Sequence, residues 1–177
     1  MTNNGKRIAI LATDGFEQSE LVRPRQLLKD AGFAVDVISP AGGEIRGWDK
    51  NDWGQAVTVD VVLTDASVDT YDALVLPGGV MNPDKLRTDT AAVDFVKSFD
   101  AAGKPIAAIC HGPWLLVESG VAKGHEVTSW PSLQTDLRNA GATWKDSEVV
   151  VDGHLITSRK PDDIPAFAKA IVESLST

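Results

Sequence analysis

The adjacent residues Cys110 and His111 carry the clearest chemical potential in this sequence, and Cys110 is its only cysteine. They follow the apolar run 106–109, which is typical of a buried strand. Gly112 and Pro113 come next and favour a sharp turn into a helix. The segment differs from the nucleophile motif G-x-S-x-G by Cys for Ser and Ala for the first Gly. It therefore predicts an elbow with an exposed thiolate, favoured by the helix N-terminus; the alternative is a small buried hydrophobe.

The rest of the sequence predicts alternating strands and helices around this elbow. Apolar runs indicate strands, helical spacing of apolar residues indicates helices, and Asp152-Gly153 indicates a hairpin turn. The glycine- and tryptophan-containing segment 40–53, with the short strands after it, is expected to be an excursion at the sheet edge, for which a hairpin is one candidate form. Its tryptophans are expected to pack locally or against a partner subunit. The predicted strands are 8–12, 34–39, 57–59, 61–63, 73–76, 106–109 and 127–129, the hairpin is 149–157, and the helices are 20–31, 90–102, 114–119, 133–140 and 164–175.

This order predicts one α/β domain over residues 1–177, an open parallel sheet with helices on both faces. Ligands of such sheets bind beyond the carboxyl ends of the strands. Three loops lie there, and they bring together a nucleophile, carboxylates and glycine amides. They carry Asp14, Glu17 and Glu20 after the first strand, Gly78 and Gly79 after 73–76, and Cys110 and His111 after 106–109.

Composition narrows the class of protein. The 177 residues are 43% hydrophobic and 24% charged, which is ordinary for a soluble domain. The net charge of −8 argues against nucleic-acid partners and anionic membrane surfaces. One cysteine cannot form an internal disulfide, and no run reaches transmembrane length, so we expect a cytoplasmic protein. The sequence has no metal-ligand spacing and predicts no cofactor.

Ordered blocks along the chain resemble the ThiJ/PfpI superfamily, most closely its small intracellular-protease and stress-protein branch. The resemblance implies a flavodoxin-like, class I glutamine-amidotransferase-like fold with Cys110 as the nucleophile. The blocks are Asp14 to Leu21 with Pro24, Leu76 to Gly79, Ala107 to Pro113, Val127 to Pro131, Val149 to Gly153 and Thr157 to Pro161.

The resemblance also implies roles for other residues. A protonated glutamate that contacts the cysteine corresponds to Glu20, four residues before Pro24, with Glu17 as the second candidate. His111 would be the base, oriented in trans by a carboxylate for which Asp84 is the nearest match, so a homodimer or larger homo-oligomer is expected. The remaining assignments are backbone N–H groups at Gly78, Gly79 and His111 for an oxyanion, and Asp14 and Trp130 in the substrate pocket, where Trp130 replaces a tyrosine frequent in peptidase members.

Three functions remain open from the sequence. The first is cofactor-independent glyoxalase III or deglycase chemistry on small reactive carbonyls, with Cys110 adding to an aldehyde and Glu20 or His111 moving protons. The second is a cysteine peptidase or amidase of the PfpI type, with a peptide substrate and Asp84 of a neighbouring chain. The third is a redox sensor or holdase chaperone that uses the same thiolate without catalysis.

Overall fold

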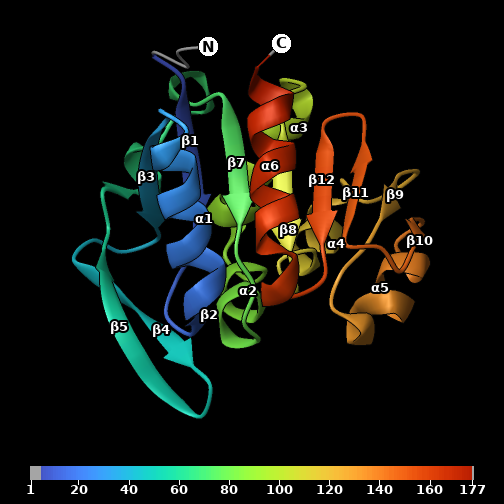
Figure 1. The fold of residues 1–177 in the computed structure, drawn as a ribbon, viewed down its shortest axis with the longest axis horizontal. Helices are drawn as coiled ribbons and strands as arrows, with labels where there is room; N and C mark the ends of the chain where they lie inside the picture. The colour runs from blue at the N-terminus through green and yellow to red at the C-terminus, as the bar shows by residue number, and fades with distance from the viewer. Residues whose placement is uncertain (1–4, 177) are drawn as a thin grey trace.

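A seven-stranded sheet forms the centre of the computed structural model, which describes residues 5–176 (Figure 1). Its neighbours run in the order β11-β12-β8-β7-β1-β3-β6, and every pair is parallel except β11 with β12. The predicted open parallel sheet is therefore confirmed. The strands are β1 (Arg7–Leu11), β3 (Ala34–Ser39), β6 (Val61–Val62), β7 (Ala73–Leu76), β8 (Ile106–Ile109), β11 (Val149–Asp152) and β12 (Leu155–Ser158).

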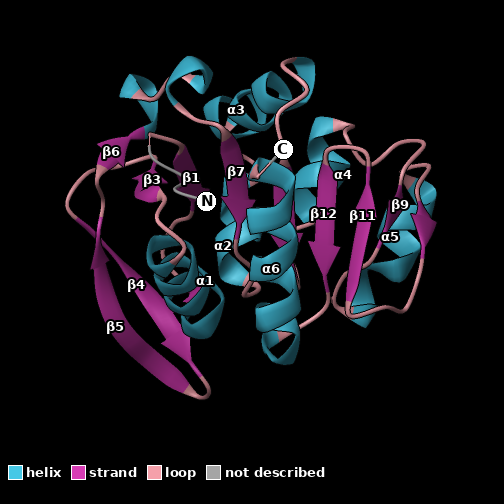
Figure 2. Cartoon of the chain, turned by 45° about the horizontal axis from the view of Figure 1, so that its top comes forward, coloured by secondary structure: helices cyan, strands magenta, loops and turns pink. Residues whose placement is uncertain are grey.

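Helices cover both faces of this sheet. Helices α1 (Gln18–Asp30) and α6 (Ile164–Leu175) pack side by side on one face, which lies toward the viewer in Figures 1 and 2. The other face is covered by α2 (Met81–Leu86), α3 (Thr90–Ala101), α4 (Trp114–Ser119) and α5 (Gln134–Asn139). Short 3-10 helices span Leu63–Asp65, Val68–Thr70, Pro131–Leu133 and Pro161–Asp163. No helix among residues 5–176 is long and apolar enough to cross a membrane.

Burial on both sides explains why the central strands are continuous apolar runs. In β7, Leu74 and Leu76 face the core under α3 and α4, whereas Ala73 and Val75 face the core under α1 and α6. Successive strand residues point to opposite faces, so a strand covered on both faces needs an apolar residue at every position. The same alternation holds in β8, which ends directly before Cys110.

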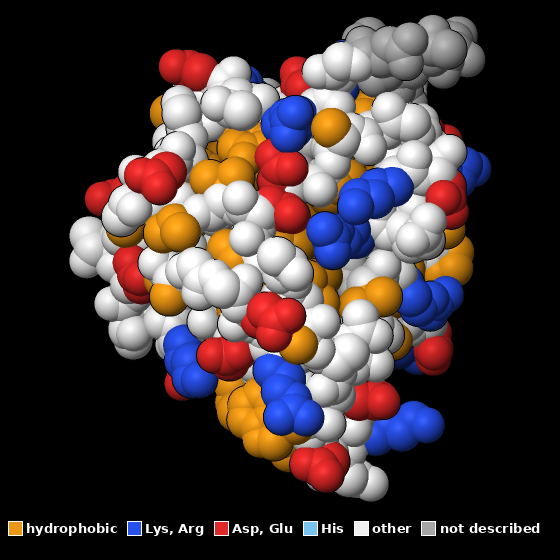
Figure 3. Space-filling view, turned by 90° about the vertical axis from the view of Figure 1, so that its left-hand side faces the viewer, with side chains coloured by type: hydrophobic (Ala, Val, Ile, Leu, Met, Phe, Trp, Pro, Cys, Tyr) orange, Lys and Arg blue, Asp and Glu red, His pale blue; other side chains and the backbone are white. Residues whose placement is uncertain are grey.

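A long hairpin lies at one edge, where the sequence predicts an excursion with short strands and offers a hairpin as one form of it; the observed strands are longer than expected. Strands β4 (Glu44–Asp49) and β5 (Asp52–Thr58) pair antiparallel and join β2 (Phe16–Glu17) in a separate sheet. Much of the hairpin is exposed, so its residues lack the apolar alternation that marks a half-buried strand. Figure 3 views this side of the molecule, with charges of both signs interspersed and hydrophobic side chains gathered at its lower end.

The remaining strands lie beside the hairpin β11–β12. Strands β9 (Glu126–Val127) and β10 (Thr143–Trp144) form a small parallel pair. The predicted strand 127–129 is thus shorter than expected, and helix α2 follows Gly79 in a segment that the periodicity did not mark as helical. Strand β1 begins and helix α6 ends at the upper end of Figure 1, and the parallel strands point to the opposite end, where the candidate site lies.

Candidate active site

Cys110 occupies a sharp left-handed turn directly after β8. Its φ of 61° is rare for a residue with a side chain and costs about 1–3 kcal/mol. Three backbone hydrogen bonds hold the turn: Cys110 N–H donates to Ser158 at 3.0 Å, Trp130 N–H donates to Cys110 at 2.9 Å, and Gly112 N–H donates to Ile109 at 2.9 Å. A side chain at Gly112 would collide with the carbonyl oxygen of Leu76. The predicted elbow and the need for glycine in it are therefore confirmed.

This backbone conformation brings two neighbouring side chains together. The distance from Cys110 Sγ to His111 Nδ1 is 3.3 Å, although adjacent side chains usually diverge. Burial lowers the pKa of His111 from its usual value near 6.5, so the imidazole is neutral at pH 7. A neutral imidazole can accept a proton from the thiol at this distance.

The thiol is more buried than the sequence predicts. Cys110 is only 7% exposed, and burial raises its pKa, with the negative charge of Glu20 acting in the same direction. Backbone N–H groups of His111 and Gly79 lower the pKa, but less than burial raises it. The sulfur is therefore buried and not exposed as expected, and its desolvation opposes the thiolate.

Glu20 lies in the first turn of α1 with its side chain completely buried beside the thiol. Burial, and then the charge of Glu17, raise its pKa well above the usual value, while contacts with Cys110 and the Gly79 N–H oppose this more weakly. Neither carboxyl oxygen has a hydrogen bond of ordinary geometry. An ionised carboxylate without partners in this position would be very costly, so Glu20 carries a proton at neutral pH.

The double glycine after β7 lets the backbone approach these side chains. A Cβ atom at Gly78 would lie 2.8 Å from both Cys110 Cβ and Glu20 Oε1. Gly79 has a φ of 76°, and a Cβ there would lie 2.5 Å from the Gly15 carbonyl oxygen. The second loop therefore presents bare backbone to the thiol, as predicted from its position.

A pocket of about 320 Å³ opens above the thiol. Its walls are mostly apolar, and its polar groups gather around Cys110, so a ligand could be bound by apolar contacts with its reactive group at the sulfur. The lining residues are Glu17, Glu20, Trp48, Gly79, Val80, Cys110, His111, Trp130 and Pro161.

Two residues predicted for the site lie elsewhere. Asp14 accepts a hydrogen bond from the Arg46 N–H at 2.7 Å and does not line the pocket. Its carboxylate ties the first loop to β4, which corrects its assignment to the substrate pocket. Asp84 is exposed on α2 and also lies outside the pocket. Among residues 5–176, no carboxylate is hydrogen-bonded to His111.

Three features of the site were not predicted from the sequence. Trp48 pairs edge-to-face with Trp53 at 5.5 Å, which is the expected local packing, but it also lines the pocket. Val80 and Pro161 add apolar wall. Buried Asn82 accepts from Thr13 N–H at 2.8 Å and donates to Gly78 at 3.2 Å, which joins two of the site loops. The sequence signal for this residue was an asparagine shortly after the double glycine. Its role could not be predicted because its partner Thr13 is distant in sequence.

The other two histidines pair with acids away from the pocket. His125 Nδ1 lies 3.2 Å from Asp152, and His154 Nε2 lies 2.7 Å from Asp100. Both histidines are half-buried. In residues 5–176, no three His, Cys, Asp or Glu side chains are placed to hold a metal ion.

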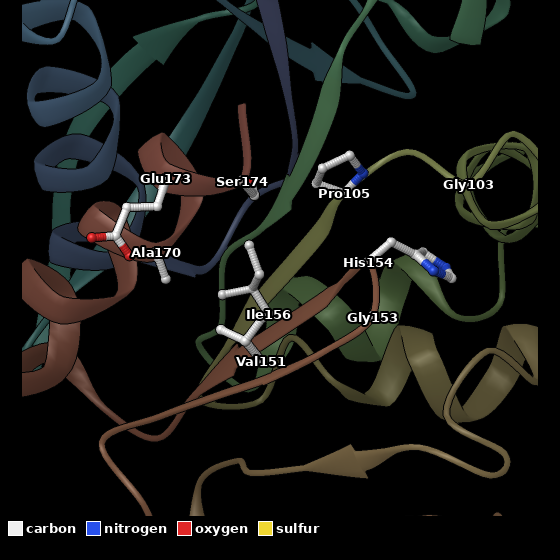
Figure 4. A pocket seen from close by; sticks show the side chains of 9 residues that line it. All are labelled: Gly103, Pro105, Val151, Gly153, His154, Ile156, Ala170, Glu173 and Ser174. Carbon is white, nitrogen blue, oxygen red and sulfur yellow. The ribbon is translucent and has the colours of Figure 1, made fainter. Parts of the chain in front are cut away.

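A second hollow, of about 400 Å³, lies near the opposite ends of β8 and β12 (Figure 4). Figure 4 shows that its walls come from α6, from the hairpin β11–β12 and from the loop after α3. It contains no cysteine, and the His154 at its edge is bonded to Asp100. The smaller pocket at Cys110 is therefore the candidate active site.

The fold and this site define a flavodoxin-like α/β protein with a cysteine on a strained turn beside a buried carboxyl group. Residues 6–174 match the DJ-1/PfpI family. The chain belongs to this family, as the resemblance predicted.

Proteins similar to this chain bear different functional names. YraA of Bacillus subtilis, whose name proposes a cysteine protease activity, is 43% identical over 163 residues, which are 92% of this chain and 94% of that protein. Protein/nucleic acid deglycase 2 of Escherichia coli is 42% identical over 171 residues, covering 96% of this chain and 98% of that protein. These names support enzymatic activity in the family. The name of the Escherichia coli protein includes nucleic acid, so these relatives do not support the expectation that nucleic acid is not a partner.

A solved structure supports the fold assignment. The protein is a two-domain protein of Anabaena variabilis with DJ-1/ThiJ/PfpI-like and ferritin-like domains. It is 38% identical in sequence to this chain, and the two structures match with a TM-score of 0.91. The match covers 96% of this chain and 48% of that protein, so the chain spans about half of its length.

Proposed function

We propose that this protein is a stress-related enzyme that uses Cys110 to convert small reactive carbonyl compounds, as a cofactor-independent glyoxalase or a deglycase. The observation that carries the proposal is the complete burial of Glu20 beside the Cys110 thiol, which raises the pKa of its carboxyl group and favours the protonated form. An uncharged carboxyl group can donate a proton and then accept one, as an isomerisation between neighbouring carbons requires.

The reaction begins when Cys110 Sγ adds to the aldehyde carbon of a 2-oxoaldehyde. His111 Nδ1, 3.3 Å away, accepts the thiol proton and returns it to the new hydroxyl, which gives a neutral hemithioacetal. The N–H groups of Gly79 and His111 stabilise the negative charge on oxygen while the C–S bond forms.

Proton transfer then moves the oxidation level from one carbon to the next. Glu20 gives its proton to the neighbouring carbonyl oxygen, and the Glu20 carboxylate or His111 removes the proton from the hemithioacetal carbon, so that an enediol forms. The same base returns this proton to the second carbon, and the hydroxyl of the first carbon gives its proton back to Glu20, which leaves a 2-hydroxy thioester. Water cleaves the C–S bond, so methylglyoxal and one water yield lactic acid and restore the thiol.

The test is incubation with methylglyoxal and measurement of lactate. Lactate should form with the wild-type protein and not with Cys110→Ala, because the alanine variant lacks the nucleophile. Wild-type lactate formation that is no faster than with the Cys110→Ala protein would contradict the proposal. Release of the free amine from a methylglyoxal-treated amino acid, measured in parallel, separates the deglycase from the glyoxalase form.

A cysteine peptidase is the second candidate, supported by the close Cys110–His111 pair and by the name of the Bacillus subtilis relative. Here His111 protonates the leaving amine, and its second nitrogen would need a carboxylate from Asp84 of a neighbouring subunit. The peptidase then depends on an oligomer, whereas the carbonyl reaction does not.

Replacement Asp84→Asn separates the two candidates. Because Asp84 lies outside the pocket of its own chain, lactate formation should change less than about twofold, within the usual range of exposed substitutions. Peptide hydrolysis, if present, should fall by about 10⁴-fold, as when the orienting acid of a triad is lost. A monomer, identified by its mass in solution, that still cuts peptides would exclude the trans arrangement.

A further inference from the structure

His111 is enclosed by two tryptophan rings. The Trp114 ring meets it edge-on, with centroids 5.1 Å apart and planes at 68°. The Trp130 ring stacks on it at 6.1 Å and 23°. Trp130 is 40% exposed and lines the pocket, whereas Trp114 contacts His111 from outside the pocket. The imidazole is therefore restrained on one side by a stacked ring and on another by a ring edge.

Trp114 is itself fixed by polar partners. Its indole N–H donates to Asp136 at 3.0 Å, and the Arg87 guanidinium lies 5.5 Å from its ring centre. Arg87 also pairs with Glu118 at 3.4 Å. The hydrogen bond of the indole N–H and the packing against the Arg87 cation leave the Trp114 ring little freedom to rotate. The ring is therefore a rigid support for the His111 imidazole.

In other cysteine and serine sites, a carboxylate orients the base and fixes its tautomer. We compare the two tryptophan rings with that carboxylate. Among residues 5–176 no carboxylate is bonded to His111, yet its Nδ1 points to Cys110 Sγ at 3.3 Å. Within the described residues, the rings of Trp114 and Trp130 are therefore the groups placed to orient the imidazole.

We propose that Trp114 is a positioning residue for His111: with Trp130 it holds the imidazole so that Nδ1 faces the Cys110 sulfur. The inference rests on the proposed role of His111 as the base in the carbonyl reaction. It predicts that the geometry of the Cys110–His111 pair depends on an aromatic ring that touches no substrate. The charged groups around this assembly are Arg87, Asp136 and Glu118 outside the pocket and Glu17 and Glu20 within it.

The test compares Trp114→Ala and Trp114→Phe by NMR titration of His111 and by the pH dependence of Cys110 alkylation with iodoacetamide. In Trp114→Ala, water reaches the ring, so the pKa of His111 should rise toward its usual value. The alkylation rate at pH 7 and the turnover number for lactate should each fall about tenfold, with KM nearly unchanged, since the lost contact orients the base and not the substrate. Phenylalanine retains a ring edge and should restore most of each signal.

Phe95→Ala is the matched control. Phe95 meets Phe99 edge-on at 5.1 Å and 80° within the core cluster that also contacts Trp114, but it does not touch His111. It should lower the melting temperature and leave the His111 titration and the alkylation profile unchanged. If Trp114→Ala fails to fold, exposed Asp136 provides a milder change: Asp136→Ala should shift the same signals in the same direction by about two- to threefold, and Asp136→Asn should restore them.

The inference would be overturned if the His111 titration and the alkylation profile of Trp114→Ala were the same as in the wild-type protein. If Trp114→Ala is unfolded, the same result in folded Asp136→Ala would overturn it. Absence of lactate formation by the wild-type protein would contradict the proposed function alone, because the titration and the alkylation require no substrate. The two failures can therefore be distinguished.

Discussion

Glu20→Gln is expected to lower the turnover number for methylglyoxal by about 10²- to 10⁴-fold, the usual contribution of a general acid–base group. Glutamine has nearly the shape of the protonated carboxyl group and can donate a hydrogen bond, but it cannot release and recover a proton. Glu20 is completely buried beside Cys110 and lines the pocket, so it is placed to exchange a proton with a ligand bound there. Lactate formation under saturating methylglyoxal measures the effect.

Alkylation of Cys110 separates loss of proton transfer from loss of the nucleophile. Because the amide N–H still faces the sulfur and carries no negative charge, the iodoacetamide rate of Glu20→Gln at pH 7 should remain within a few-fold of wild type. The exposed Glu148, in the loop before β11, provides the control Glu148→Gln, which should match wild type in both assays. Unchanged lactate turnover in Glu20→Gln would remove Glu20 from the reaction and leave His111 as the base.

The central sheet was predictable because burial on both faces dictates its sequence. Strand β7 and strand β8 are short apolar runs bounded by turn residues, and both occupy the predicted positions. The hairpin 44–58 was predicted only as an excursion with short strands, because it contains two glycines and exposed charges at strand positions, and its register breaks between Arg46 and Trp48. Its pairing depends on tertiary contacts such as the Asp14 bond to Arg46, which leave no periodic signal.

The site was predictable where the topology alone decides it. The rule that ligands bind at the carboxyl ends of parallel strands selected the loops that carry Glu20, Gly79 and Cys110, and all three line one pocket. The state of the thiol was not predictable, because it depends on burial, which raises its pKa more than backbone N–H groups lower it. The Cys110–His111 contact depends likewise on a φ of 61°, which the residue types do not encode.

Cys110 and Glu20 have different roles in the proposed reaction. With Glu20 protonated, the negative charge that raises the pKa of the thiol is absent, and the carboxyl can donate to the sulfur. A neutral His111 at 3.3 Å can then accept the thiol proton when a carbonyl carbon approaches. The thiol would thus be activated by proton transfer during addition and would remain largely protonated in the free enzyme.

Burial of Glu20 also predicts an unusual dependence of stability on pH. Its pKa is higher in the folded protein than in the unfolded chain, so the folded state binds more protons between the two values. The free energy of unfolding contributed by this group is fully present below about pH 4.5 and is lost as pH rises toward the folded pKa, with a slope of up to about 1.4 kcal/mol per pH unit. Ordinary paired carboxylates give the opposite sign.

Glu20→Gln should therefore be more stable than wild type at pH 8, and the difference should shrink as pH falls toward 4.5, where the wild-type carboxyl is protonated in both states. Urea denaturation at pH 5, 6, 7 and 8 gives the free energies, and Glu148→Gln controls for the replacement of a carboxyl group by an amide at an exposed position. A constant difference across this range would mean that the pKa of Glu20 is the same in both states. Stability gained at pH 8 together with lost turnover would identify the protonated carboxyl as a group maintained for chemistry at the expense of the fold.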